Sequence, residues 1–289
     1  MSSNQLGSGV SVLNGNLGGS FDILSGSAGE NPKLGIGRRY GVASAAYSLR
    51  DIGAEGGPVI NVTRSTDTAR QDFSAVQIVD GTLETFIGAG NNGTIKIWYD
   101  QSGNGKHLNA PTDVAREPTI VSSGTLVTDN GKPAFSCNSS EYFSLSGTDT
   151  VDAKAFYVVV NVASALIVRD LMGMKSSSDN FMRFQNDDDE QVKWNGTSHV
   201  FGATVEDKQI IISVDIDSSD DLRYFEDGSQ SGTTKSGSTG NFQMSRFLRR
   251  ATENTEFQGK VQEAIFFDTD QAASRTDITN ELNAYYGAF

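Results

Sequence analysis

Short runs of β-branched and aromatic residues recur along this chain, and turn-forming residues bound each run. Two runs, AFYVVVNVA (155–163) and QIIISVDID (209–217), are apolar enough to be central strands buried on both faces. The run DLRYFEDG (221–228) alternates and ends at Asp227-Gly228, which is a strong hairpin signal. These patterns predict an all-β fold, an antiparallel two-sheet sandwich or jelly roll with a few short helices.

Further strands are expected where similar runs occur: PVINVTR (58–64), TIKIWY (94–99), KPAFSCN (132–138), EYFSLSG (141–147), FMRFQND (181–187), QVKWNG (191–196) and VQEAIFFD (261–268). Helical spacing predicts a first helix over 39–50, and a helical turn is expected over 82–87. A last helix should follow Ser274, which has Asp277 three residues later as in a capping box. Its apolar face carries Ile278, Leu282 and Tyr285, and Gly287 should end it.

Composition narrows the classes of partner. The chain has 31 glycines and 5 prolines, which suits many tight turns. Its net charge of −13 argues against nucleic acid as a partner. No apolar stretch approaches the roughly 18 residues that cross a bilayer, and no secretory signal is visible, so we expect no membrane partner. Cys137 is the single cysteine, so no internal disulfide can form, in keeping with synthesis in a reducing compartment.

The first 37 residues differ in composition from the rest. They are rich in glycine, serine and asparagine, with apolar residues only in short islands. Such a segment cannot build its own core, and we expect an arm that becomes ordered against another surface, such as a neighbouring subunit. A flexible tail is the alternative. Residues 38–289 then form one jelly-roll domain.

The segment WYDQSGNGKHL (98–108) is the most distinctive stretch of the chain. Its acid and amide spacing imitates a calcium loop, but Pro111 occupies the position that needs a bidentate acid. A catalytic Asp100–His107 pair lacks a recognisable nucleophile elbow. The preferred interpretation is a structural corner, with an anchoring aromatic pair, a capping carboxylate and two glycines in unusual conformations. Its residues are Trp98, Tyr99, Asp100, Gly103 and Gly105.

Two charged clusters have open interpretations. The run NDDDEQ (186–191) includes Asp187, Asp188 and Asp189, which form a solvated loop or bind calcium through clustered carboxylates. No other cofactor is expected. The basic cluster Arg246, Arg249 and Arg250 is either a solvated loop or a contact for an acidic neighbouring subunit, since a homo-oligomer is expected.

Sugar binding by such a sandwich would use exposed aromatic rings for stacking and amide or imidazole groups for hydroxyls. Trp194 is the strongest candidate, with Asn195 and His199 beside it and Tyr224 on another predicted strand. The alternative is that Trp194 packs in the core.

Two blocks of the sequence resemble known families. The first comprises AAYSLRDIG (45–53), GPVINVTRSTDTARQDF (57–73) and ETFIGAGNNGTIKIWYDQSGNGKHL (84–108), followed by REPTIV and NGKPAFS. It resembles a module of phage tail and virion proteins, which is similar to the catalytic domain of arabinofuranosidase B, glycoside hydrolase family 54. The second, EFQGKVQEAIFFDTDQAASRTDITNELNAYYG (256–287), looks like the last strand and helix of concanavalin A-like, laminin-G-like jelly rolls.

The resemblance implies a structural phage virion protein, tail-associated or decorating the capsid, made in the host cytoplasm. Its partners would be other virion proteins, through the arm, and host-surface glycans. The nucleophile context of the hydrolase family is missing from the chain, and we expect no catalytic residues and no enzyme activity. The alternatives are a glycoside hydrolase acting on surface polysaccharide and a free carbohydrate-binding module.

Overall fold

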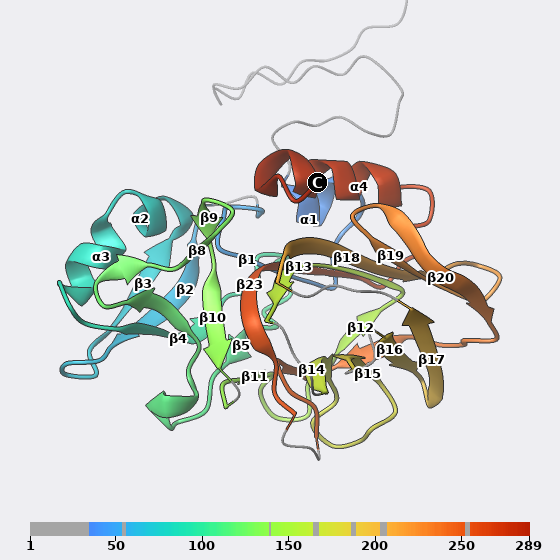
Figure 1. The fold of residues 1–289 in the computed structure, drawn as a ribbon, viewed down its shortest axis with the longest axis horizontal. Coiled ribbons are helices and arrows are strands. Elements are labelled where there is room, and N and C mark those ends of the chain that lie inside the picture. Colours follow the sequence, from blue (N-terminus) through green and yellow to red (C-terminus); the bar gives the residue numbers. More distant parts are fainter. Residues whose placement is uncertain are drawn as a thin grey trace, which may run out of the picture. The chain divides into compact units, whose positions relative to one another are not determined.

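Antiparallel strands dominate the structure, as the alternating and apolar runs of the sequence predict (Figure 1). A computed structural model of the chain describes residues 35–289 except 54–55, 139, 164–167, 186–188, 203–206 and 252–254. These residues belong to one compact unit, Asn31–Phe289. The predicted arm therefore lies outside the described residues up to residue 34, and its anchoring role stays a prediction.

Strand pairing arranges the unit in two layers around one core. The first layer follows the order β3 (Arg70–Ser74), β2 (Pro58–Arg64), β4 (Gly93–Trp98), β6 (Thr119–Ser122), β10 (Phe135–Asn138), β23 (Gln258–Phe267), β13 (Ala155–Val162), β18 (Gln209–Ile216), β19 (Asp221–Glu226) and β20 (Ser229–Ser236). The second layer follows the order β5 (Leu108–Asn109), β11 (Phe143–Ser144), β22 (Arg246–Phe247), β14 (Arg169–Gly173), β15 (Phe181–Phe184), β16 (Asp189–Trp194) and β17 (Thr197–Gly202).

Short strands complete the sheets. β4 pairs with both β5 and β6 and so links the two layers. The remaining strands are β1 (Ala45–Ser48) along β23, β7 (Thr125–Leu126) along β6, the pair β8 (Thr128–Asp129) and β9 (Lys132–Pro133), and the pair β12 (Val151–Ala153) and β21 (Phe242–Met244). The all-β jelly-roll prediction is confirmed.

Buried side chains form two clusters that reflect the alternation of the strands. The larger cluster lies between the layers and includes Trp98, Phe156, Trp194 and Phe247. The smaller one lies on the outer face of the first layer, where α4 (Arg275–Tyr286) and α1 (Ile36–Arg39) cover β13, β18 and β23 (Figure 1). Two more helices, α2 (Ala75–Val79) and α3 (Thr82–Ile87), pack beside β3, and a 3-10 turn, η1, spans Val114–Arg116.

Two helix predictions need correction. Residues 39–50 do not form a helix; α1 ends at Arg39 and Ala45–Ser48 is a strand. All four residues of this strand are buried and pair with β23, so tertiary pairing overrides the local helical spacing. The last helix forms as predicted and ends at Gly287 in the left-handed region, but the Ser274 side chain makes no capping hydrogen bond. None of the helices among the described residues is long and apolar enough to span a bilayer.

Candidate functional site

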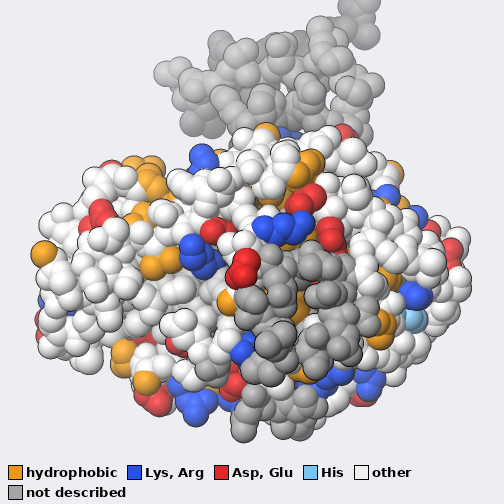
Figure 2. Space-filling view, viewed as in Figure 1, with side chains coloured by type: hydrophobic (Ala, Val, Ile, Leu, Met, Phe, Trp, Pro, Cys, Tyr) orange, Lys and Arg blue, Asp and Glu red, His pale blue; other side chains and the backbone are white. Residues whose placement is uncertain are grey.

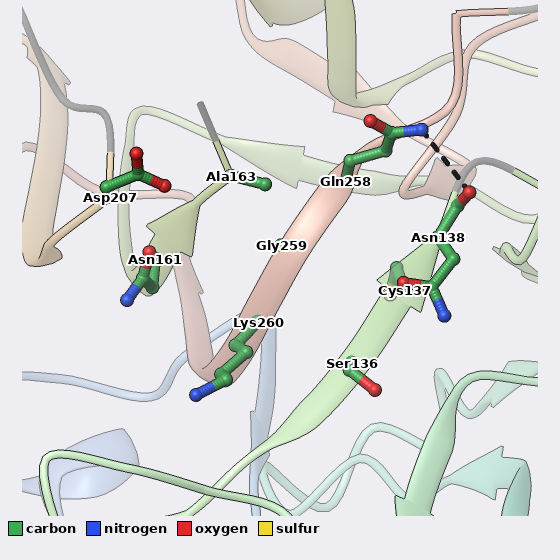
Figure 3. A pocket seen from close by; sticks show the side chains of 9 residues that line it. All are labelled: Ser136, Cys137, Asn138, Asn161, Ala163, Asp207, Gln258, Gly259 and Lys260. Carbon is green, nitrogen blue, oxygen red and sulfur yellow. Dashed lines mark hydrogen bonds between the residues drawn. The ribbon is translucent and has the colours of Figure 1, made fainter. Parts of the chain in front are cut away.

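An open polar pocket lies on the outer face of the first layer, on strands β10, β23 and β13. On β13, Tyr157 and Val159 point toward the cluster that α4 covers, and alternation places Asn161 on the same face one step further along. Antiparallel register sets Asn161 and Ser136 on either side of Lys260, and Asn138 opposite Gln258. Figure 3 shows these side chains around Gly259 on the central strand. We call this pocket the polar trough.

The polar trough has a volume of about 450 Å³. Six of its nine lining residues have hydrogen-bonding side chains on this face, namely Ser136, Asn138, Asn161, Asp207, Gln258 and Lys260; the other three are Cys137, Ala163 and Gly259. The Cys137 side chain is buried on the opposite, inner face, and burial raises the pKa of its thiol well above the usual range. The trough therefore presents hydroxyl, amide, carboxylate and ammonium groups.

Neighbouring groups position these side chains without using all of their hydrogen-bonding capacity. Lys260 donates to the carbonyl oxygen of Thr128 at 2.8 Å and to the carboxylate of Asp129 at 3.4 Å. Asn161 donates to the same carboxylate at 3.2 Å, and its amide oxygen accepts no hydrogen bond within the described part of the chain. Gln258 donates to the carbonyl oxygen of Asn138 (Figure 3). The trough thus offers fixed donors and acceptors to a polar ligand.

Gly259 sets the spacing of the strands beneath the trough. Its φ is +139°, and a Cβ atom at this position would lie 2.0 Å from the carbonyl oxygen of Asn161. Any side chain would push β13 away from β23 and separate Asn161 from Lys260. A glycine inside a strand commonly marks such a close backbone approach.

The WYDQSGNGKHL segment forms a tightly bonded corner after β4. The Asp100 carboxylate accepts hydrogen bonds from the backbone N–H of Ala46, Ser102 and Lys106 and from the Ser102 hydroxyl. Trp98 is fully buried, and Gly103 and Gly105 have φ of +93° and +69°. His107 accepts from the Asp100 N–H through Nδ1 at 3.1 Å and packs edge-on against Tyr99. Both rings also border a cavity of about 340 Å³ beside Arg38 and Asp51.

The aromatic residues proposed for sugar stacking are buried, which corrects that expectation. Trp194 has 0% exposure, packs against Phe242 and donates its indole N–H to the carbonyl oxygen of Gly240. Tyr224 also has 0% exposure and stacks on Phe201 at 5.2 Å. Alternation turns both side chains toward the core, so neither offers a ring face to a saccharide.

The polar neighbours of Trp194 have structural contacts. Asn195 and Gly196 have φ of +47° and +89° and form the tip of the β16–β17 hairpin. His199 is 8% exposed and its Nε2 lies 2.7 Å from the Ser238 hydroxyl. Burial and the positive charge of Lys235 lower the pKa of His199, which favours the neutral ring.

The acidic run proposed for calcium lies largely outside the described residues. Asp187 and Asp188 fall in the undescribed segment, and Asp189 begins β16. Within the described ranges, no group of three or more His, Cys, Asp or Glu residues is arranged to hold a metal.

A different acid stands out electrostatically. Glu226 follows Tyr224 by two positions on β19, and burial raises the pKa of its carboxyl to about 7. Glu226 is partly buried, whereas Glu190 on the facing layer is buried, and the charge of Glu190 contributes to the raised pKa of Tyr224. Both acids therefore lie close enough to Tyr224 for their charges to raise the pKa of its hydroxyl.

Sequence reasoning missed the polar trough. Two signals pointed to it: Asn161 interrupts the apolar run AFYVVVNVA, and Gly259 interrupts the strand before VQEAIFFD. Considered within its own strand, each residue is only a single departure from the apolar pattern and indicates no site. Only the register of β10, β23 and β13 brings them together.

Comparisons with known proteins identify a similar fold. No protein-family profile matches the chain, and no curated protein matches it. An arabinofuranosidase complexed with arabinofuranosyl-α-1,2-xylobiose matches with a TM-score of 0.62 and 15% identity over 85% of this chain. A glycoside hydrolase family 54 α-L-arabinofuranosidase with a cyclic sulfate inhibitor matches with a TM-score of 0.60 at the same identity. The chain covers 63% of each of those chains. The likeness establishes a shared β-sandwich fold.

Proposed function

We propose that this chain is a non-catalytic glycan-binding β-sandwich. The polar trough is the observation that supports the proposal most directly. Its serine, asparagine and lysine side chains provide the donors and acceptors that bind saccharide hydroxyls. The shared fold adds support, because one of the similar structures holds an arabinofuranosyl-xylobiose.

Calorimetric titration with neutral oligosaccharides, including arabinofuranosyl-α-1,2-xylobiose, tests this function. Asn161→Ala and Asn138→Ala should each weaken binding about tenfold, because each removes one amide that meets the ligand. Gln230→Ala is the matched control, since it removes an exposed amide from β20. Failure of every saccharide to bind, or equal affinity in all variants, would contradict the proposal.

Display on a phage virion is the finer part of the proposal. It is supported by the sequence resemblance and by the absence of an internal disulfide, with residues 1–37 as the anchoring arm. Ile36 is buried in the smaller cluster, so an anchoring test should leave it in place. Deleting residues 1–30 should preserve the melting temperature and abolish incorporation into particles, measured by mass spectrometry. Unchanged incorporation would argue against the arm.

A glycoside hydrolase is the second candidate, and one observation favours it. A carboxyl with a pKa of about 7, as at Glu226, suits a general acid at neutral pH. Incubation with arabinoxylan should then release reducing ends, and Glu226→Gln should stop the release. No release by the unmodified protein would eliminate this candidate for that substrate.

A further inference from the structure

The outer face of the second layer carries a concentration of positive charge in an otherwise acidic chain. The inner residues of these strands, such as Phe143, Met182 and Phe247, belong to the main core, so their neighbours in sequence point outward. Antiparallel register joins the outward residues into one row across six strands: Ser144, Arg246, Gly173, Phe181, Lys193 and Ser198. Figure 2 shows several Lys and Arg side chains, with Asp and Glu side chains between them, along the lower edge of the view, below the place where Figure 1 draws β11 and β14.

Two aromatic rings organise the cations on this face. The guanidinium groups of Arg246, Arg249 and Arg116 lie 5.0, 5.2 and 6.0 Å from the ring centre of Tyr142. Those of Arg250 and Arg183 lie 4.2 and 5.2 Å from the ring centre of Phe181. We define Arg116, Tyr142, Phe181, Arg183, Lys193, Arg246 and Arg249 as the arginine face. Stacking on the rings limits the rotation of the guanidinium groups.

Carboxylates neutralise only part of this charge. Arg250 is buried and pairs with Asp170 at 3.1 Å, so it serves the fold and not the surface. Arg249 pairs with Glu256 at 3.0 Å, and Arg116 lies 3.8 Å from Asp113.

Two cations of the row, Arg246 and Lys193, differ from these arginines because they do not pair with a carboxylate of the described residues. Arg246 donates to the Ser144 hydroxyl and the Arg250 carbonyl oxygen, both of which are neutral acceptors. Lys193 is partly exposed. Neither residue has a carboxylate within 4.0 Å among the residues that the structure describes. Burial lowers the pKa of Arg246 and the neighbouring Arg249 also lowers it, although Tyr142 and Glu256 act in the opposite direction.

From this arrangement we propose that the arginine face binds an acidic polysaccharide through the carboxylates of successive uronate residues. Arg246 and Lys193 are three strand spacings apart, about 14 Å, so a repeating anion fits the row better than a single small one. Planar guanidinium groups bind carboxylates through paired hydrogen bonds. The saccharide class rests on the proposed function, whereas the position and charge of the face do not.

Titration with polygalacturonate at low salt tests the proposal. The unmodified protein should bind, and binding should weaken about tenfold between 50 and 200 mM salt because exposed charges are screened. Arg246→Gln with Lys193→Gln should weaken it at least about tenfold. Arg246→Lys keeps the charge but loses the paired hydrogen-bond geometry. The affinity of this variant for polygalacturonate should lie between those of the unmodified protein and the double variant. Lys235→Gln on β20 is the matched control for loss of one positive charge and should bind normally.

The remaining comparisons separate this proposal from its competitors. Asn161→Ala, in the polar trough, should keep full affinity for polygalacturonate. The proposal for the trough and the proposal for the arginine face can therefore fail independently, because different variants and ligands test them. Equal binding by the double variant, with melting temperatures unchanged, would overturn the proposal. So would the absence of binding by the unmodified protein, or tighter binding of single-stranded oligo-dT than of polygalacturonate.

Discussion

Asp100 and Ala46 are joined by a hydrogen bond of 2.9 Å from the Ala46 N–H to the Asp100 carboxylate, across 54 residues of sequence. The bond fixes the start of β1 to the corner after β4. The same carboxylate also accepts from Ser102 and Lys106 and is almost completely buried. One acid thus organises two segments that are distant in sequence.

Replacing that acid should destabilise the domain. Asp100→Ala leaves several buried N–H groups without acceptors, and we expect a loss of about 3 kcal/mol in the free energy of unfolding. Urea denaturation measures the change. Asp268→Ala, which removes an exposed carboxylate, should lose less than about 0.5 kcal/mol. Equal stability of the two variants would contradict the structural role of the corner.

Gly259→Ala tests the close approach of β13 and β23. The added Cβ would collide with the Asn161 carbonyl oxygen, so we expect a loss of more than about 2 kcal/mol in stability. Gly237→Ala is the control, because Gly237 also has positive φ, +84°, but has open space around it. Its loss should be about 1 kcal/mol, which is the conformational cost alone. Thermal denaturation of both variants separates collision from backbone strain.

Tryptophan fluorescence reports directly on the buried rings. Trp98 and Trp194 are the two tryptophans of the chain, and both have 0% exposure. Acrylamide should therefore quench the folded protein weakly, and saturating saccharide should leave the emission maximum unchanged. Strong quenching that saccharide suppresses would place Trp194 at a sugar site.

Glu226 should make stability depend on pH in a defined window. Its folded pKa of about 7 exceeds the ordinary value of 4.5, so the folded state binds the extra proton between these values. Stability from this group is greatest below pH 4.5 and is lost as the pH rises toward 7 and above. Denaturation at pH 5 and at pH 8 measures this change. Between the two pH values, the free energy of unfolding should fall more for the unmodified protein than for Glu226→Gln. Identical falls would show that Glu226 titrates normally.

Much of the fold follows from local pattern, because burial between two layers imposes a strict alternation. Pro58–Arg64 and Thr82–Ile87 form the predicted strand and helix, and Asp227-Gly228 turns the β19–β20 hairpin. Local pattern fails at Ala45–Ser48, where pairing with β23 decides the structure.

The candidate sites depend on register, which local sequence does not encode. The sequence around Trp194 is compatible with a core position and with a surface position, and only the position of its strand in the sheet shows that the ring is buried. The basic cluster separates into a buried ion pair at Arg250 and a partly exposed cation at Arg246 only when β22 and β14 are paired.

The central claim is that the polar trough binds a saccharide, and side-chain amide resonances test it most directly. Titration of the labelled protein with a neutral oligosaccharide, followed by NMR, should shift the side-chain NH₂ signals of Asn138 and Asn161. The signal of Gln230, on a different strand, should stay in place. Shifts confined to residues outside the trough, or no shifts with any saccharide, would contradict the account.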